Sequence, residues 1–538
     1  MVRHHSLLLS GLVAAAAALT AAAIPSPAQA ASIKASTDTS TETTATATAA
    51  TTTADITTAD ITTADITAAD GVVLNAVVAA PTSAGRHPAI VFISIWGLND
   101  LEYVAQQQAF AAHGYIVVSY TARGFWNSGG QIETAGPQDV ADLSTVIDWT
   151  LAHTAADPAR IGVGGISYGA GISLLGAAHD ARIKAVVSMS AWSDLVASLY
   201  GDQTRHLQSA GLLALAAQLT GRPSPELSTE LGNFFADRNV DEVQAWARTR
   251  SAASYVDAIN ANHPAVLIAN AYGDTVFPPN SLIDFFGRLT TAKRLELAPG
   301  DHAVVEAGGL LGLPNNVWTD ATRWFDQYLS GVDTGIAGEP PVQLRRLGSS
   351  GAEGYADWAH VTGTVQRFQL GSSGYLGATA QSGWTRTVIG GVDTTADGGI
   401  PLLTNGLAAL TGVAPSVWLP SVNLFNAGEW VTGSQPALQV RGIPKVHLRV
   451  SGSRGTVVAY LYDVDALGDA KLVTHAPSTW TTAVGAIDLS LPAIAYDVPG
   501  GHRLALVVDT VDPLYSTATA FGQTLTFSGP SWVDLPLS

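Results

Sequence analysis

The fold is decided by one stretch of the chain, Gly165-Ile166-Ser167-Tyr168-Gly169. It follows the apolar run 161–164 and precedes the helical pattern of residues 170–175, so the serine lies at a sharp turn between a predicted strand and a predicted helix. The pattern Gly-x-Ser-x-Gly in this context indicates a nucleophile elbow, whose strained backbone holds the serine Oγ where a substrate carbonyl can reach it. We expect the backbone N–H of Tyr168 to face the developing oxyanion.

Short apolar runs alternate with helical stretches on both sides of this turn. Strands are predicted at residues 89–93, 115–119, 161–164, 183–189, 265–269 and 294–298. This alternation is typical of an α/β domain, here residues 71–340, in which helices cover both faces of a parallel sheet. Residues 195–258 contain helical runs and no clear strand, which predicts a helical cap inserted over the ligand-binding edge of the sheet.

The pattern changes after about residue 340. Short strands separated by Gly, Pro and Asp are predicted at residues 365–370, 445–451, 455–464, 486–491, 502–508 and 523–528. Many short strands without helices between them favour an all-β sandwich or jelly roll over residues 341–538. A chain of 538 residues is long enough for two domains with separate cores.

The N-terminus has the pattern of a targeting signal. Arg3 and two histidines precede an apolar run over residues 7–23, and the segment ends in Ala28-Gln29-Ala30. This pattern predicts a secretory signal peptide over residues 1–30, cleaved after Ala30, with an uncleaved anchor as the alternative. We therefore expect a secreted protein, extracellular or associated with the cell wall. The chain contains no cysteine, so disulfides do not stabilise it.

Residues 31–70 are mostly Thr, Ala, Ser and Asp, and they repeat the motif Thr-Ala-Asp-Ile at 53–56, 58–61 and 63–66. This composition predicts a disordered linker or a wall-spanning stalk, because it offers little apolar surface to bury.

Charge and composition exclude several classes of partner. The formal net charge of −18 argues against nucleic acid and against anionic membranes, because both require clustered Lys and Arg. No group of His, Cys and carboxylates has metal-ligand spacing, and no glycine-rich loop opens a helix to bind phosphates. The sequence therefore predicts neither a metal nor another cofactor.

A serine nucleophile needs a base and an acid that orients the base. In chains with this elbow the order is Ser, then Asp or Glu, then His. Asp274 follows the predicted strand 265–269, and His302 follows the predicted strand 294–298, so both lie at the sheet edge that carries Ser167. Asp301 is the rival acid, but it adjoins His302, from where orienting the ring Nδ1 is awkward.

The second oxyanion donor is expected in the loop after the first strong strand, at residues 94–99. Either the backbone N–H or the indole N–H of Trp96 could donate. The alternative is that Trp96 only forms a wall of the substrate pocket.

Further motifs carry a family resemblance. They are Thr121-Ala122-Arg123-Gly124 before Ser128-Gly129-Gly130, the elbow itself, Gly273-Asp274 with Phe277-Pro278-Pro279, Gly300-Asp301-His302, Tyr460-Leu461-Tyr462-Asp463-Val464 and Gly501-His502-Arg503-Leu504. In order and spacing the chain from about residue 72 to 538 resembles the cocaine esterase and X-prolyl dipeptidyl-peptidase family of α/β-hydrolases. The resemblance implies an α/β-hydrolase domain with a helical cap and a galactose-binding-like jelly roll. It also implies Ser167 as nucleophile, His302 as base and Asp274 as orienting acid.

Two positions depart from that family. Thr121 stands where members often have Asp, which predicts that a salt bridge to Arg123 is missing. Trp96 stands where esterase members have an oxyanion-hole tyrosine.

The sequence thus predicts a serine hydrolase that acts on a small-molecule ester or a short peptide through an acyl-enzyme. Esterase activity is slightly favoured over X-Pro dipeptidyl-peptidase activity. The peptidase would need cap carboxylates for a free amine, and the candidates are Glu226, Glu230, Asp237, Asp241 and Glu242. A third hypothesis is an inert glycan-binding or wall-binding protein, against which the complete Ser, Asp and His order argues.

Overall fold

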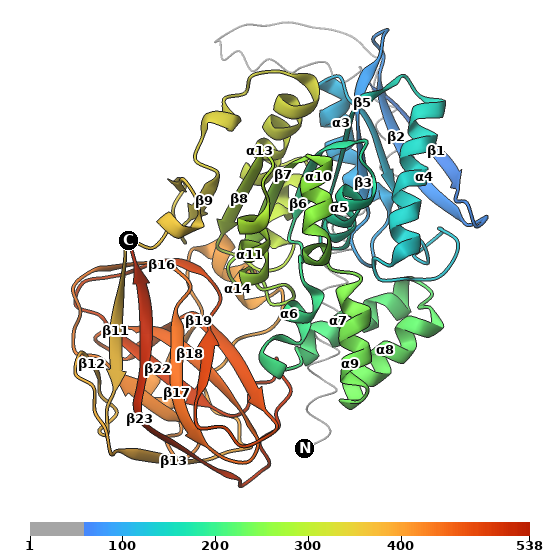
Figure 1. Cartoon of the computed structure of the whole chain (residues 1–538). Coiled ribbons are helices and arrows are strands. Elements are labelled where there is room, and N and C mark those ends of the chain that lie inside the picture. The colour runs from blue at the N-terminus through green and yellow to red at the C-terminus, as the bar shows by residue number, and fades with distance from the viewer. Residues whose placement is uncertain (1–58) are drawn as a thin grey trace, which may run out of the picture.

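The structure is a computed structural model that describes residues 59–538. The predicted signal peptide 1–30 and the predicted linker up to residue 58 lie outside the described residues. The described chain has a large α/β domain and a separate β domain, and the cap helices α7, α8 and α9 extend from the α/β domain alongside the β domain (Figure 1). The predicted fold class, an α/β domain followed by an all-β domain, is confirmed.

Ten strands form the central sheet in the order β1-β2-β4-β3-β5-β6-β7-β8-β9-β10. The strands from β4 to β9 in this order are parallel, and the edge pairs β1–β2, β2–β4 and β9–β10 are antiparallel. Their bounds are β1 Ala59–Thr67, β2 Val73–Pro81, β3 His87–Ile93, β4 Ile116–Tyr120, β5 Ala156–Ile166, β6 Ile183–Met189, β7 Ala265–Ala271, β8 Lys293–Ala298, β9 Val342–Arg345 and β10 Ala352–Tyr355.

Helices cover both faces of this sheet. Alternate residues of β3 show why: Val91 packs into the hydrophobic cluster under α4, α5, α10 and α11, and Phe92 packs into the cluster under α3 and α13. The helices are α3 Val104–Ala112, α4 Pro137–His153, α5 Tyr168–His179, α6 Leu195–Leu199, α7 Leu207–Thr220, α8 Pro225–Ala236, α9 Val240–Arg248, α10 Val256–Asn262, α11 Asn280–Arg288, α12 Val304–Leu310, α13 Asn316–Phe325 and α14 Thr404–Thr411.

The observed α/β domain extends beyond both of its predicted boundaries. Residues 59–67, predicted as part of the linker, form β1 because Ile66 is buried in the core opposite Leu74 and β-branched Thr residues suit a strand. At the other end, β9 extends the parallel sheet and β10 folds back on it, beyond the predicted boundary at residue 340.

The β domain consists of two antiparallel sheets with a shared core. Along β18, residues such as Leu461 face that core, and residues such as Tyr460 face a second cluster beneath the loops of residues 396–427. The strands are β11 Thr364–Leu370, β12 Leu376–Gly377, β13 Thr385–Ile389, β14 Ser416–Trp418, β15 Gly428–Val431, β16 Leu438–Gly442, β17 Lys445–Ser451, β18 Gly455–Val464, β19 Asp469–Trp480, β20 Ile487–Ser490, β21 Ile494–Val498, β22 Arg503–Asp509 and β23 Thr524–Leu537.

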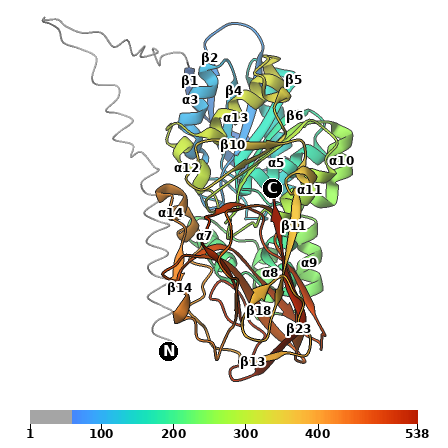
Figure 2. The same cartoon turned by 90° about the vertical axis from the view of Figure 1, so that its left-hand side faces the viewer.

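One helix interrupts the region predicted as all-β. Helix α14 leaves the β domain and packs beside α12 of the α/β domain (Figure 2). The Nδ2 of Asn405 in α14 donates to the carbonyl oxygen of Gly273 at 2.9 Å. The C-terminal part of the chain therefore contacts the loop that carries Asp274.

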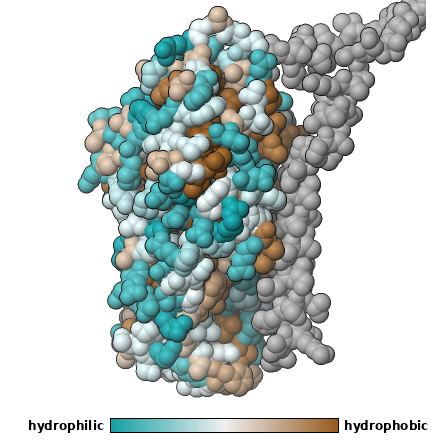
Figure 3. Space-filling view, turned by 90° about the vertical axis from the view of Figure 1, so that its right-hand side faces the viewer, coloured by the Kyte–Doolittle hydropathy of each residue, from teal (hydrophilic) through white to brown (hydrophobic). Residues whose placement is uncertain are grey.

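The surface on the cap side of the molecule is mostly hydrophilic, with patches of hydrophobic residues concentrated in its upper half (Figure 3). Within residues 59–538, no helix combines the length and apolar character needed to cross a membrane.

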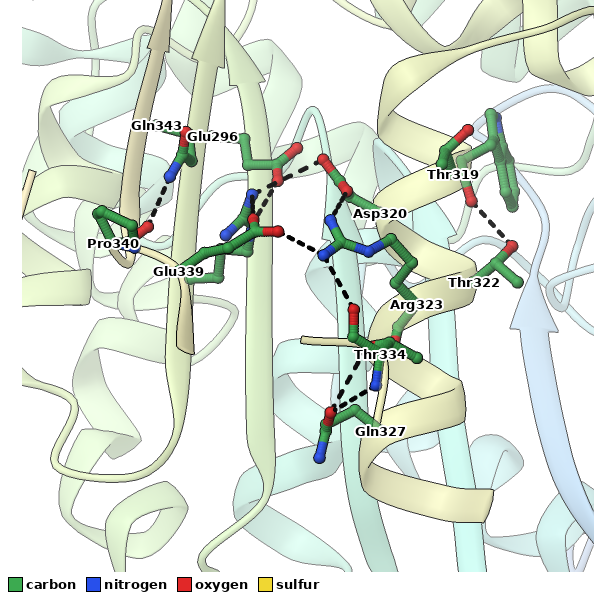
Figure 4. Close-up of polar contacts among 12 residues, drawn as sticks. Glu296, Thr319, Asp320, Thr322, Arg323, Gln327, Thr334, Glu339, Pro340 and Gln343 are labelled. Atoms are coloured by element: carbon green, nitrogen blue, oxygen red, sulfur yellow. Dashed lines mark hydrogen bonds and ion pairs between the residues drawn. The ribbon is translucent and has the colours of Figure 1, made fainter. Parts of the chain in front are cut away.

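A buried ionic network fixes the end of the α/β domain away from the elbow. The Nε of Arg294 donates to Glu296 at 2.5 Å, and its Nη2 donates to Glu339 at 3.1 Å. Arg323 in α13 bridges Asp320 and Glu339 (Figure 4). The network joins β8, α13 and the segment that leads into β9.

Candidate active site

Ser167 lies at the turn between β5 and α5 with φ 56° and ψ −110°, a left-handed conformation that ordinary residues rarely adopt. The backbone around the elbow leaves no room for a side chain at either glycine. A Cβ at Gly169 would lie 2.1 Å from the carbonyl oxygen of Ile93, and a Cβ at Gly165 would lie 2.7 Å from the backbone of Gly169. The motif therefore lets β3, β5 and α5 meet closely beneath the serine.

The structure brings the three predicted triad residues together. The Oγ of Ser167 lies 2.7 Å from Nε2 of His302, and Nδ1 of His302 lies 3.0 Å from Oδ2 of Asp274. All three side chains are buried. Each residue lies in the turn or loop that follows a strand of the parallel sheet, so the shared sheet edge brings them within hydrogen-bond reach.

Asp274 and Asp301, the two candidates for the orienting acid, have different hydrogen-bond partners. The second oxygen of Asp274, Oδ1, accepts hydrogen bonds from the backbone N–H groups of Val276 and Phe277 at 2.9 and 2.6 Å, which fixes the carboxylate toward the ring. Asp301 instead accepts hydrogen bonds from the backbone N–H groups of Thr275 and His302 and from the Thr275 hydroxyl. Asp301 thus binds the backbone of its own loop and the Thr275 loop, and Asp274 contacts the imidazole.

Burial and neighbouring charge set the protonation of this site. Burial opposes a charge on His302, but the Asp274 carboxylate, together with the charges of Asp301 and Glu306, more than offsets it, so the pKa of His302 is raised. Burial, with the charge of Asp274, raises the pKa of Asp301 to about 6.

Glu306 is a buried acid that the sequence reasoning missed. Its Oε1 accepts a hydrogen bond from the Ser190 hydroxyl at 3.0 Å, and that hydroxyl accepts the N–H of Ala303 at 3.0 Å. Burial raises the pKa of Glu306 to about 7. The available signal was an acidic residue four positions after His302, in the first turn of α12.

The two residues predicted to supply oxyanion donors, Tyr168 and Trp96, both line the pocket that contains Ser167. The N–H of Tyr168 is the first of α5 and has no acceptor within its helix. The indole of Trp96 is not free, because its Nε1 donates to the carbonyl oxygen of Leu213 at 2.9 Å. The backbone N–H of Trp96 makes no hydrogen bond within residues 59–538. Of the two donors predicted for Trp96, only the backbone group is therefore available.

A pocket opens beside Ser167 beneath the cap, and we call it the Ser167 pocket. Its walls are aromatic and aliphatic, and include Trp96, Trp192, Phe277 and Trp246. Trp96 is therefore also a wall, as the alternative predicted.

None of the predicted cap carboxylates lines the Ser167 pocket. Glu226 lies 3.4 Å from Arg250, and Asp237 lies 3.7 Å from Arg205. Glu230 lines a neighbouring pocket, and Asp241 and Glu242 are exposed on the first turn of α9. Within residues 59–538, no three His, Asp or Glu side chains are grouped to hold a metal ion.

Arg123 has partners other than the aspartate that the family often has at position 121. Its guanidinium binds Asp142 at 2.6 and 2.7 Å and Asp70 at 3.0 Å. The predicted loss of one salt bridge is thus compensated from α4 and the β1–β2 turn. Thr121 instead donates its hydroxyl to Asp100 at 2.8 Å.

Comparisons with known proteins agree with this architecture. A model of the X-Pro dipeptidyl-peptidase (S15 family) matches residues 70–304, and a model of the X-Pro dipeptidyl-peptidase C-terminal non-catalytic domain matches residues 435–531. The two matches together cover more than half of the chain.

Curated relatives match only part of the chain. A quorum-quenching protein, AidA, of Acinetobacter baumannii is 30% identical over 131 residues, which are 23% of this chain and 41% of the relative. An uncharacterised 31.7 kDa protein of Escherichia coli is 31% identical over 20% of this chain and 39% of its own length. The chain thus spans about two fifths of the length of the curated relatives it matches.

Solved structures share the whole architecture. An α-amino acid ester hydrolase is similar with a TM-score of 0.71 at 17% identity, over 91% of this chain and 100% of that one. An aminopeptidase from a marine sediment Thaumarchaeota archaeon has a TM-score of 0.70 at 16% identity, over 94% and 100%. A CocE/NonD family hydrolase from Staphylococcus aureus has a TM-score of 0.66 at 12% identity, over 88% and 93%. With both family models matched in order on this fold, the chain belongs to the cocaine esterase and X-prolyl dipeptidyl-peptidase family of α/β-hydrolases.

Proposed function

We propose that the protein is a secreted serine esterase that cleaves esters with an apolar acyl group. The observation that carries the proposal is the Ser167 pocket, because its lining residues include no carboxylate that could bind the free amine of a dipeptide. The hydrogen-bonded order of Ser167, His302 and Asp274 supports a serine hydrolase mechanism. Secretion is supported by the signal-peptide pattern of residues 1–30.

Acylation needs two proton transfers, one from Ser167 to His302 and one from His302 to the leaving group. Nε2 of His302 takes the proton of Ser167 as Oγ bonds to the ester carbonyl carbon, and the backbone N–H groups of Tyr168 and Trp96 donate to the oxyanion. His302 then gives the proton to the leaving alcohol as the carbon–oxygen bond breaks. Water attacks the acyl-enzyme by the same path, releasing the acid and restoring Ser167.

The test compares purified protein on p-nitrophenyl butyrate and on Ala-Pro p-nitroanilide. We expect hydrolysis of the ester, none of the anilide, and fluorophosphonate labelling of Ser167. Ser167→Ala should abolish hydrolysis and labelling, whereas Ser173→Ala, which removes another buried serine of α5, should preserve both. Preferential cleavage of the anilide would establish the peptidase instead, and absence of labelling would favour an inert binding protein.

A further inference from the structure

A second pocket lies within the cap next to the Ser167 pocket, and we call it the cap pocket. It lies between α6, α7, α8 and α9. Six side chains line both pockets, namely Leu195, Leu199, Ala210, Leu227, Leu231 and Trp246. One layer of side chains, five of them aliphatic, therefore separates the cap pocket from the pocket that contains the nucleophile.

Helix periodicity explains the composition of this layer. Leu227 and Leu231 are four residues apart on α8, so both face the same side of the helix. Trp246 on α9 is held by Arg250, whose guanidinium carbon lies 4.0 Å from the ring centroid. Leucine side chains can change rotamer while the helices stay in place, so the leucines are the part of the layer that can open.

Charged side chains also line the cap pocket. They are Arg205, Glu230, Asp237 and Arg238. Asp237 and Arg238 are exposed, so the cap pocket meets solvent beside these two residues. The cap pocket therefore combines the leucine layer that it shares with the Ser167 pocket and a part that is open to solvent.

We propose that the two pockets form one acyl-binding channel and that the substrates are esters of medium-chain to long-chain fatty acids. The carbonyl lies at Ser167, and the hydrocarbon chain passes Leu231 into the cap pocket. The six side chains that line both pockets and the mostly apolar walls on either side of them carry this assignment, because a linear hydrocarbon chain that displaces the leucines can fill both spaces without burying a polar group of its own. The proposal rests on the esterase function proposed above and names its substrate class.

The first test uses the unmodified protein and two ester series. In p-nitrophenyl esters from acetate to dodecanoate, kcat/KM should rise by up to about fourfold per methylene, the gain expected from burying one CH₂ group. In alkyl acetates of increasing alcohol length, kcat/KM should stay nearly level. The channel proposal is wrong if kcat/KM falls for acyl chains longer than butyrate, or if it rises only with the length of the alcohol.

The second test narrows the cap pocket without entering the Ser167 pocket. Val243 lines the cap pocket alone, so Val243→Trp should lower the ratio of dodecanoate to butyrate kcat/KM at least about tenfold, the effect of losing a few buried methylenes. Leu231→Phe should lower the same ratio from within the shared layer. Leu219→Trp, on the exposed side of α7, should leave the ratio unchanged.

The outcomes separate the two proposals. If neither Val243→Trp nor Leu231→Phe lowers the ratio of dodecanoate to butyrate kcat/KM, the channel proposal is wrong. Hydrolysis of acetate and butyrate but of no longer ester overturns the channel and leaves the esterase proposal standing. A protein that hydrolyses no ester overturns the proposed function and the channel together.

Discussion

Replacing Asp274 with asparagine tests the assignment of the orienting acid, because asparagine keeps the shape of the side chain and changes one contact. In the native protein Oδ1 of Asp274 accepts two backbone N–H groups, at 2.9 Å from Val276 and 2.6 Å from Phe277. An asparagine oxygen preserves both bonds only if its NH₂ group takes the place of Oδ2. That NH₂ group then faces Nδ1 of His302, 3.0 Å away in the native protein.

The consequence is a change of tautomer. A ring that accepts a hydrogen bond at Nδ1 carries its proton on Nε2, the atom 2.7 Å from the Oγ of Ser167. Such a ring cannot accept the serine proton. We expect kcat of Asp274→Asn to fall by about 10⁴-fold. KM should change little, because Asp274 does not line the Ser167 pocket.

The matched control is Asp301→Asn. Asp301 accepts its hydrogen bonds at Oδ1 from Thr275 and from the backbone of His302, and an asparagine oxygen can accept all of them. Steady-state kinetics on p-nitrophenyl butyrate should therefore show a far smaller loss for Asp301→Asn. An equal or larger loss for that variant would refute the assignment of the orienting acid.

Three further results are expected. Because His302 must be neutral to act as a base and its pKa is raised, kcat/KM should fall as the pH is lowered through a value above that of free histidine, which a pH–rate profile measures. Glu306 binds its proton more tightly in the folded state, with a pKa of about 7, so its burial lowers stability as the pH rises. The Tm of Glu306→Gln should therefore exceed that of the native protein by more at about pH 8 than at about pH 5. At about pH 5 the native carboxyl is already protonated, so the substitution removes no charge. Arg294→Met leaves Glu296 buried without its cation and should cost about 3–5 kcal/mol in urea unfolding, against under about 1 kcal/mol for Arg367→Met at an exposed pair.

The triad could be predicted because its positions depend on local patterns. Ser167, Asp274 and His302 each follow an apolar strand, and the carboxyl ends of parallel strands meet at one sheet edge. Short-range patterns fix the strands, and the sheet topology supplies the long-range contact. Nothing more was needed to place the three side chains within hydrogen-bond reach.

The features that could not be predicted depend on contacts that the residue types involved do not indicate. The indole of Trp96 is bound by Leu213, 117 residues away, and neither residue type indicates the other. Strand β1 was missed because a Thr/Ala-rich repeat looks like a linker until Ile66 packs opposite Leu74. Helix α14 has a weak pattern of its own, and it packs against α12.

The β domain supports the active site from two sides, although it supplies no triad residue. Through Asn405 it holds the carbonyl of Gly273, the residue before Asp274. Through the carbonyl of Leu514 it accepts a hydrogen bond from the N–H of Gln208, in the first turn of α7.

These two contacts connect parts of the site that look independent in the sequence. Helix α7 carries Leu213, whose carbonyl accepts the indole N–H of Trp96 and so connects the loop of residues 94–99 to the cap. Hydrogen bonds therefore connect the loop that carries Asp274 and the cap, with the loop that carries Trp96, to the same β domain. We expect the β domain to position the cap and the Asp274 loop relative to Ser167.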